Sequence, residues 1–434
     1  GELPAGFTLE EYSAAPDAIP VHGPETILRR IKSAKVVYDI SQVTTSMQTN
    51  VTFTLLDENG EEVIINIAFP SRTVYAKAWR VPVGRISLYL LDTDIDQNSA
   101  EDRGITGKLY GGDSEMRIKQ EMFLGIGGIR LMDRINLKPT VYHCNEGHAA
   151  FCGLERLSVY ITRHNLDFDV AKELVRTSTL FTTHTPVPAG HDVFEEHLMR
   201  TYLSHYPGRM NISWDDFMNL GKIRHNDPYE KFSMSVLATN LSQEVNGVSK
   251  IHGRVSREMF QQMWPGYFAE ENHIGYVTNG VHLPTWTDFS WQRLYREVLG
   301  KDYVDVQSDT KVWEKINNVA DETVWNIKKD LKHRLTEYLK VKVVEDMQRR
   351  QESPSLIINT IENFNENALI IGFARRFATY KRAHLLFNNI ERLAELLNNP
   401  EKPVVFLFAG KAHPNDKPGQ DLIKMIIETS RKKE

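Results

Sequence analysis

Four cationic side chains and one histidine follow an apolar segment, ALIIGFA (368–374), in the last fifth of the chain. They are Arg375, Arg376, Lys381, Arg382 and His384. Open parallel sheets bind their ligands at the carboxyl ends of strands, and guanidinium and ammonium groups at such an end suit phosphate. By itself the motif is equally consistent with a phosphate clamp and with solvated surface cations.

A second polar loop, HCNEGH (143–148), also follows an apolar segment and contains Asn145, Glu146 and His148. We predict no metal here, because the HExxH spacing of zinc enzymes is absent and Gly147 disfavours a helix through the motif. In the structural interpretation, Asn145 or Glu146 caps the helix that follows. In the functional interpretation, these short polar groups bind sugar hydroxyls.

Two further loops have the same strand-end position. HTPVPAGH (184–191) begins with His184, and a lone histidine is usually structural unless its position favours a role. TNGVHLPTW (278–286) contains Asn279, whose amide can donate and accept hydrogen bonds to a hydroxylated ligand. Trp286 is then either a sugar platform or a core tryptophan, and AGKAHPND (409–416) adds Lys411.

The elements that must position these loops alternate between strands and helices. Strands are predicted at 140–144, 179–183 and 275–279, and residues 232–260 are predicted as two helices around a turn at Asn246-Gly247. This alternation predicts an α/β fold with a mainly parallel sheet.

The segment before these units is different. Residues 35–95 alternate like β-strands around an Asn59-Gly60 turn, and 94–104 form a polar loop. Residues 114–135 are helical, with Met116, Phe123, Leu124, Ile126 and Leu131 as candidate buried positions. GIGG (125–128) lies inside this helix and not between a strand and a helix, so it predicts close helix packing, not a dinucleotide loop.

A second α/β region follows a boundary near 285–300. A long charged helix is predicted over 306–350, then an irregular stretch over 351–367. Strands at 368–374 and 403–409 alternate with helices at 383–398 and 419–430. We therefore predict domains at 1–285 and 286–434, both incomplete, with ends that resemble interior points of a longer protein.

Composition narrows the class of protein. The 434 residues are 41% hydrophobic and 25% charged with a net charge of −5, so we expect no nucleic-acid partner. Apolar runs such as VVFLFAG (404–410) are too short to span a bilayer, so we expect no membrane. The two cysteines, Cys144 and Cys152, are too few for disulfides to stabilise a chain of this length. This favours a reduced, cytoplasmic location.

Taken in order, these motifs resemble the α-glucan phosphorylases of the glycogen and maltodextrin phosphorylase family, in their short prokaryotic form. The resemblance runs from about Thr73 to Pro414. The matching segments are LYGGDSEMRIKQE, HCNEGHAAFCGLER, FTTHTPVPAGHDVFEEH, NGVSKIHGRVSREMF, TNGVHLPTW, ARRFATYKRAHLL and AGKAHP.

The resemblance implies a fold, a reaction and a cofactor. The fold is of GT-B type, with two Rossmann-like domains facing a cleft. Residues 1–285 would be part of the N-terminal glucan domain, and residues 286–434 would be the start of the C-terminal phosphate and cofactor domain. The reaction is reversible, retaining phosphorolysis of an α-1,4-glucan to glucose 1-phosphate. Pyridoxal 5′-phosphate takes part through its phosphate group. A homodimer of the full-length protein is compatible with the family.

The resemblance also implies residue roles. Arg376 and Lys381 would hold the substrate phosphate, and Arg375 with Lys381 would lie near the cofactor phosphate. His184 would lie beside the glucosyl unit. Asn279 would bond the 6-hydroxyl of the sugar, while Glu146 and His148 match a loop near the glucose pocket.

The family pattern is not complete in these residues. A glycine-rich loop of the family and the lysine that forms the Schiff base with the cofactor are not found in this chain. We therefore expect it to correspond to the middle of a phosphorylase, to bind cofactor poorly and to be inactive by itself. The alternatives are a nucleotide-sugar glycosyltransferase such as a glycogen synthase, and a non-catalytic glucan-binding module. A glycoside hydrolase would need two suitably spaced carboxylates.

Overall fold

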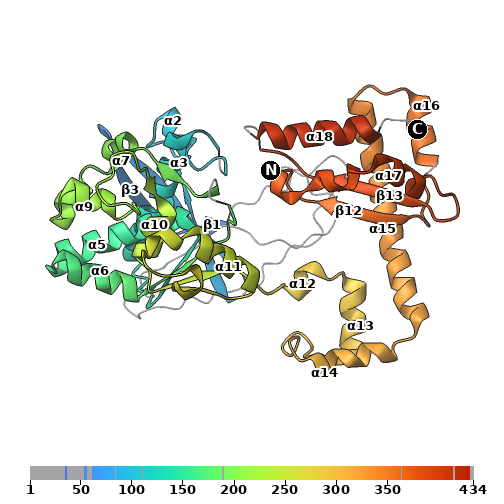
Figure 1. Cartoon of the computed structure of the whole chain (residues 1–434), viewed down its shortest axis with the longest axis horizontal. Helices are drawn as coiled ribbons and strands as arrows, with labels where there is room; N and C mark the ends of the chain where they lie inside the picture. Colours follow the sequence, from blue (N-terminus) through green and yellow to red (C-terminus); the bar gives the residue numbers. More distant parts are fainter. Residues whose placement is uncertain are drawn as a thin grey trace. The chain divides into compact units, whose positions relative to one another are not determined.

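The computed structural model describes residues 35–36, 53–55, 61–83, 85–109, 111–187, 190–362, 364–413 and 416–430 (Figure 1). The chain forms two compact units, Gly1–Gly280 and Val281–Glu434. The predicted turn at Asn59-Gly60 lies outside the described residues. The assignment of 1–285 and 286–434 to a glucan domain and a phosphate domain stays a prediction.

The first unit begins with an antiparallel sheet, as the alternating pattern predicts. Its strand order is β1-β2-β4-β3, and β5 pairs with β4. Along β3 the side chains of Ile65, Ile67 and Phe69 are buried while those between them are more exposed, which is the period of two that a one-sided sheet requires. The strands are β1 (Lys35–Val36), β2 (Phe53–Thr54), β3 (Ile64–Phe69), β4 (Arg72–Val83) and β5 (Ile86–Asp92).

The predicted helix at 114–135 is confirmed, but it contains a π-helical turn. It consists of α3 (Ser114–Met122), a π-helix (Phe123–Gly127) and α4 (Gly128–Arg134). Gly125 allows the close packing predicted for GIGG, since a Cβ there would lie 2.7 Å from the backbone nitrogen of Cys152. Leu124 is 55% exposed, so its predicted burial was wrong; Phe123 and Ile126 define the buried face.

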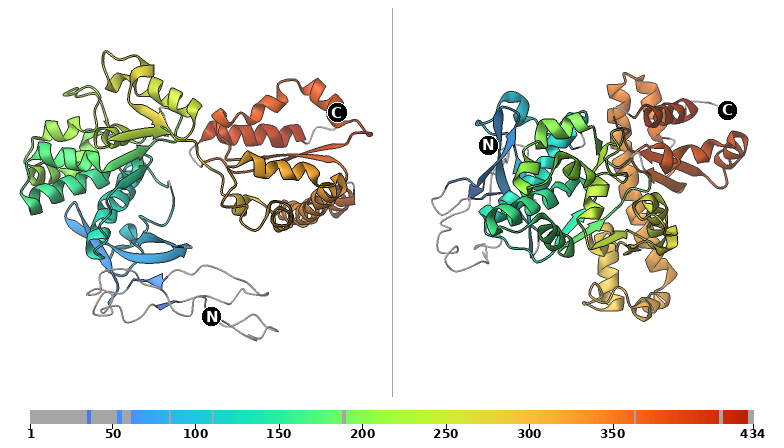
Figure 2. Two further views of the ribbon diagram at one scale, coloured as in Figure 1. Left: turned by 90° about the horizontal axis from the view of Figure 1, so that it is seen from below. Right: turned by 60° about the vertical axis from the view of Figure 1, so that its left-hand side comes forward.

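A four-stranded parallel sheet follows, with order β11-β10-β7-β6 (Figure 2). The predicted α/β class with a parallel sheet is confirmed. The strands are β6 (Tyr142–Asn145), β7 (Thr179–Thr182), β10 (Glu244–Gly247) and β11 (Ile274–Tyr276). The principal helices are α5 (Phe151–His164), α6 (Phe168–Thr177), α10 (Met234–Asn240) and α11 (Lys250–Met259).

Strand β10 corrects the predicted turn at Asn246-Gly247, because both residues lie within the strand. Its sequence, EVNG, has little β-propensity, and its pairing with both β7 and β11 stabilises it instead. The buried Asn246 accepts a hydrogen bond from the Thr182 hydroxyl (2.9 Å) and donates one to the Gly247 carbonyl (3.1 Å).

The remaining elements of the first unit are short. They are α2 (Ala100–Arg103) in the predicted 94–104 loop, a 3₁₀-turn (Gly147–Ala149), β8 (Val193–Phe194), α7 (Glu196–Leu203), α8 (Tyr206–Met210), α9 (Trp214–Asn219), β9 (Phe232–Ser233), and 3₁₀-turns at Gln261–Met263 and Ala269–Glu271. One large apolar core joins both sheets and their helices.

The second unit contains a parallel strand pair, β12 (Leu369–Ala374) with β13 (Val404–Ala409). Residues 351–367 were predicted to be irregular, but they include helix α16 (Pro354–Glu362), which contacts α15. The predicted helix at 306–350 is divided, as is that at 383–398. The helices are α12 (Leu283–Trp286), α13 (Phe289–Leu299), α14 (Thr310–Trp313), α15 (Asp321–Arg349), α17 (Ile390–Leu397) and α18 (Lys417–Ser430), with 3₁₀-turns at Glu314–Asn318, Thr379–Lys381 and Ala383–Phe387. Among the described residues no helix is long and apolar enough to cross a membrane.

Candidate functional site

In the first unit, the carboxyl ends of the four parallel strands lie at one edge of the sheet. Asn145 of β6 is aligned with Thr182 of β7, and Thr182 is aligned with Asn246 of β10. The loops that begin there include Glu146, His148, His184 and Asn279. All of these predicted side chains therefore belong to loops that begin at the edge where parallel sheets bind ligands.

Glu146 joins the first two of these loops. Its Oε1 atom accepts a hydrogen bond from the backbone nitrogen of His184 (2.5 Å) and another from the Thr185 hydroxyl (3.0 Å). The Asn145 Oδ1 atom lies 2.6 Å from Nε2 of His184. The predicted capping role is wrong, because neither side chain bonds the start of the following helix.

The backbone of Glu146 is strained. Its φ of 73° and ψ of 167° fall in a region that is populated almost only by glycine. The conformation is held from both sides, because the Glu146 backbone nitrogen donates to the Thr182 carbonyl (2.9 Å) while its buried carboxylate binds His184. Strain of this kind concentrates at ligand-binding loops.

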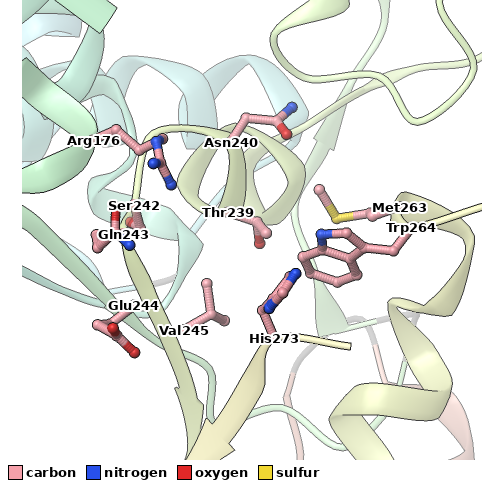
Figure 3. A pocket seen from close by; sticks show the side chains of 10 residues that line it. All are labelled: Arg176, Thr239, Asn240, Ser242, Gln243, Glu244, Val245, Met263, Trp264 and His273. Atoms are coloured by element: carbon pink, nitrogen blue, oxygen red, sulfur yellow. The ribbon is translucent and has the colours of Figure 1, made fainter. Parts of the chain in front are cut away.

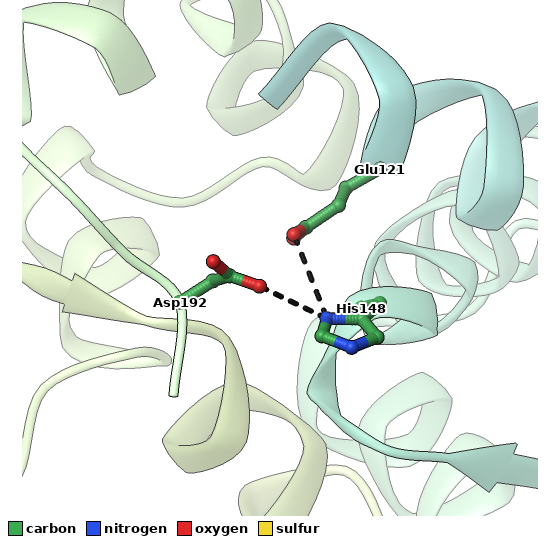
Figure 4. A group of neighbouring side chains, drawn as sticks. All are labelled: Glu121, His148 and Asp192. Atoms are coloured by element: carbon green, nitrogen blue, oxygen red, sulfur yellow. Dashed lines mark hydrogen bonds and ion pairs between the residues drawn. The ribbon is translucent and has the colours of Figure 1, made fainter. Parts of the chain in front are cut away.

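His148 belongs to a charged network with residues from two other segments (Figure 4). Its Nδ1 atom lies 2.9 Å from Asp192 Oδ2 and 3.8 Å from Glu121 Oε1. The Arg117 guanidinium bonds both carboxylates, at 2.6 Å to Asp192 and 2.9 Å to Glu121. These four groups hold the 143–148 loop against α3 and against the loop after His184.

The network shifts the acidities of its members. Hydrogen bonding to Asp192, helped by Glu121, raises the pKa of His148 to about 9. Burial raises the pKa of Glu121 to about 7. Burial opposes the charge of Asp192 as well, but hydrogen bonds from His148 and Arg117 outweigh it and hold the pKa of Asp192 well below its usual range. His148 is therefore a cation at neutral pH.

The Glu121, His148 and Asp192 ligand atoms are close enough together to suggest a metal ion. The guanidinium of Arg117 already bonds both carboxylates. A second cation would have to displace it, so we interpret the group as an ion-pair network.

Asn279 and Trp286 lie farther along the chain. The backbone nitrogen of Asn279 donates to the Val248 carbonyl (3.1 Å), which ties the loop after β11 to the loop after β10, and its side chain is exposed. Trp286 belongs to the second unit and is 78% exposed, so the core interpretation of this tryptophan is wrong.

In the second unit, the cationic loop after β12 is joined to the loop after β13. The backbone nitrogens of Arg375 and Phe377 donate to the carbonyls of Ala409 (3.1 Å) and Lys411 (2.9 Å). Gly410 permits this close approach, because a Cβ there would lie 2.1 Å from the Arg375 carbonyl oxygen. The predicted cations of the two loops thus follow the same end of the parallel pair β12 and β13.

These cations have no carboxylate partner among the residues that the structure describes. In the described parts of the chain, no carboxylate lies within ion-pair distance of Arg375, Arg376 or Lys381. Lys381 Nζ lies 4.7 Å from the ring centroid of Tyr380. Burial opposes ionisation of Tyr380, but Arg376 and Lys381 outweigh it and lower its pKa. The loop is suited to bind an anion.

Sequence reasoning missed three members of the His148 network: Arg117, Glu121 and Asp192. Arg117 and Glu121 are four residues apart on α3, a spacing typical of helical ion pairs. That spacing was a usable signal. Asp192 is distant in the sequence from His148, so no local spacing could indicate its role in the network.

Comparison with known proteins identifies the family. Residues 97–432 match the family model described as carbohydrate phosphorylase, and residues 1–75 match one described as YbbR-like protein. Maltodextrin phosphorylase of Thermococcus litoralis is 41% identical over 381 residues, covering 87% of this chain and 44% of that protein.

Two glycogen phosphorylases show the same relationship. That of Mycobacterium tuberculosis is 40% identical over 385 residues, covering 86% of this chain and 44% of that protein. That of Aquifex aeolicus is 34% identical over 378 residues, covering 87% and 54% respectively. This chain thus spans about half the length of these relatives. Since the phosphorylase model matches most of its residues, the chain belongs to the carbohydrate phosphorylase family.

Proposed function

We propose that the chain is part of an α-1,4-glucan phosphorylase, which transfers a glucosyl unit between a glucan and inorganic phosphate and produces glucose 1-phosphate. The observation that supports this most directly is the loop of Arg375, Arg376 and Lys381, whose charges have no partner among the described carboxylates. In a carbohydrate phosphorylase, such a loop at a strand end suits a phosphate substrate.

In this proposal the two units are the incomplete Rossmann-like domains of a GT-B fold. Arg376 holds two oxygens of the substrate phosphate with its planar guanidinium group, and Lys381 adds a compact positive charge. Together they stabilise the negative charge that gathers on phosphate during the transfer. Gly410 keeps the Arg375 backbone next to β13, which fixes where the loop begins.

The loops of the first unit bind the sugar. Asn279 bonds the 6-hydroxyl, and the exposed side of its amide is available for this. Glu146 positions His184 beside the glucosyl unit through the bond to its backbone nitrogen. His148, held by Asp192, presents its ring near the same pocket.

The family resemblance implies pyridoxal 5′-phosphate, and the cations fit its phosphate group. Arg375 and Lys381 would hold that phosphate, since neither is paired with a carboxylate of the described ranges. When bound, the cofactor supplies a phosphate that exchanges a proton with the substrate phosphate. The two free thiols, Cys144 and Cys152, support a cytoplasmic location, and a homodimer of the full-length enzyme belongs to the same proposal.

A product assay tests the proposal. The full-length protein, incubated with maltoheptaose and inorganic phosphate, should release glucose 1-phosphate, and removal of phosphate should abolish release. Free glucose without phosphate would indicate a hydrolase. Transfer from a nucleotide sugar, unaffected by removal of pyridoxal phosphate, would indicate a synthase. Binding of glucan with no reaction would indicate a binding module. Each of these three outcomes would contradict the proposal.

A further inference from the structure

Two free thiols flank the loop that contains Asn145, Glu146 and His148. Cys144 is in β6 and Cys152 is in the first turn of α5, and their sulfur atoms are 3.5 Å apart. Both side chains are buried, at 3% and 9% exposure. Since a disulfide bond is about 2.05 Å long, the sulfurs need to approach by only about 1.5 Å to form one. The pair is therefore well placed to be joined.

The surroundings of the two sulfurs differ. Cys152 lies at the start of a 14-residue helix, where the Gly153 backbone N–H interacts with its sulfur. The hydrogen bond with Cys144 lowers the pKa of Cys152, and Arg156 and Gly153 add to this effect, although burial opposes it. The same hydrogen bond and burial raise the pKa of Cys144 well above its usual range. Cys152 is thus the better thiolate, and the thiolate is the form of cysteine that reacts.

Arg156 is a buried cation without an anionic partner in the described structure. It is 4% exposed and lies four residues after Cys152 on α5. Its guanidinium donates to the hydroxyls of Thr179 (2.7 Å) and Ser178 (2.5 Å) and lies 3.7 Å from the ring centroid of Tyr142. No carboxylate of the described ranges is within ion-pair distance of it. Because buried charges are normally paired, a Cys152 thiolate would supply the missing counter-charge.

We propose that Cys144 and Cys152 are a modification site, at which a hydroperoxide forms a disulfide that constrains the loop between them. The reaction takes two steps. The Cys152 thiolate attacks one oxygen of hydrogen peroxide, which forms a sulfenic acid and releases hydroxide. The Cys144 thiol then attacks the sulfenic sulfur, and its proton leaves with the sulfenic oxygen as water. Two electrons pass from the sulfurs to the peroxide, and a dithiol reductant reverses the change.

The position of the pair favours a small oxidant. Neither cysteine lines the pocket of about 410 Å³ at the amino ends of β10 and β11 (Figure 3). A bulky oxidant such as glutathione disulfide needs an open approach to a sulfur atom, which two buried thiols do not offer. Hydrogen peroxide is little larger than water and reaches buried groups through local opening of the fold.

The disulfide would act on the loop that positions His184. The ring that it closes contains Asn145 and Glu146, whose side chains hold His184 at 2.6 and 2.5 Å. The start of α5 is held by close packing, since a Cβ at Gly125 would lie 2.7 Å from the Cys152 nitrogen. The movement therefore falls on the 143–148 loop, and we expect the disulfide to slow the reaction. This effect on the reaction rests on the proposed function, whereas formation of the bond does not.

Mass spectrometry of this chain tests the modification. Both cysteines fall in one tryptic peptide, residues 135–156, because Lys138 is followed by proline and is not cleaved. The peptide contains no methionine, so the cysteines are its only sulfur atoms. After treatment with hydrogen peroxide it should be lighter by two hydrogen atoms and take up no maleimide, and dithiothreitol should restore both reactive thiols. A peptide that still takes up two maleimides after peroxide would overturn the proposal.

Single variants identify the nucleophile. In Cys144→Ser, the remaining thiol should stop at a sulfenic acid that dimedone labels. In Cys152→Ser, the remaining thiol should react with peroxide about tenfold more slowly, because it has the higher pKa. Equal rates in the two variants would contradict the two-step reaction. The wild-type measurement stands even if a variant fails to fold.

The rate of the full-length enzyme tests the effect on the reaction. Peroxide should lower glucose 1-phosphate release by about tenfold, since a misplacement of about 1 Å near the reacting groups has effects of this size or larger. Dithiothreitol should restore the rate, and the double variant Cys144→Ser/Cys152→Ser should keep its rate in peroxide. Equal inactivation of the double variant, or a disulfide that leaves the rate unchanged, would overturn this effect. Failure of the proposed function is distinguishable, because the disulfide would then form in a protein that releases no glucose 1-phosphate.

Discussion

The backbone nitrogen of His184 donates to the Glu146 carboxylate at 2.5 Å, and this bond fixes the loop after β7 against the loop after β6. Glu146 has a backbone conformation suited to glycine, yet a glycine would lack the carboxylate. The strain and the hydrogen bond therefore occur at the same residue. Without the bond, the His184 nitrogen would lose its acceptor.

The first prediction distinguishes the role of the Glu146 side chain as a hydrogen-bond acceptor from the role of its negative charge. Glu146→Ala should lower the free energy of unfolding by about 1–3 kcal/mol, since it leaves the His184 nitrogen without its partner. Glu146→Gln keeps an amide oxygen at the same place and should cost less. Amide hydrogen exchange at His184 checks this, and equal protection in the Ala and Gln variants would contradict it.

The second prediction concerns pH. The pKa of His148 is raised to about 9, above its unfolded value of about 6.5. Its contribution to stability is therefore fully present below pH 6.5 and is lost as the pH rises through 9. Because the ring is partly solvated, we expect a loss of about 1 kcal/mol. Chemical unfolding measured across this range checks the sign.

Two variants isolate the groups responsible. His148→Gln should flatten the decline between pH 6.5 and 9. Glu121→Gln should flatten an earlier decline, because the pKa of Glu121 is raised to about 7 and its favourable protonated form is lost between pH 4.5 and 7. Unchanged slopes in both variants would show that the network does not control the pH dependence.

The third prediction concerns Gly410 in the second unit. A Cβ at this position would lie 2.1 Å from the Arg375 carbonyl oxygen, so Gly410→Ala must separate the two cationic loops. We expect a loss of about 1–3 kcal/mol in the free energy of unfolding. Gly372→Ala is the matched control, because a Cβ there would meet nothing within 4 Å. Equal midpoints for the two variants would contradict the packing argument.

The sequence could predict the strand-end loops because each one joins an apolar strand to polar residues, a local signal. It could not predict β10, since EVNG is stabilised by pairing with β7 and β11, which are distant along the chain. The contact between His148 and Asp192 has the same origin, because its partners are 44 positions apart in the sequence. The residues next to Trp286 in the sequence likewise give no signal that its side chain is exposed.

The last prediction tests the cationic loop in the full-length enzyme. Arg376→Ala should lower kcat/KM for phosphate by about 10²–10³, the range found when one electrostatic contact to a transition state is removed. Arg376→Lys should recover only part of this, because an ammonium group cannot bind two oxygens in a fork. Arg392→Lys is the control, since Arg392 is exposed and pairs with Glu395 at 2.7 Å on α17. If Arg376→Ala retained the wild-type KM for phosphate and the wild-type kcat, phosphate would have to be bound elsewhere, and Arg376 would be a solvated surface cation.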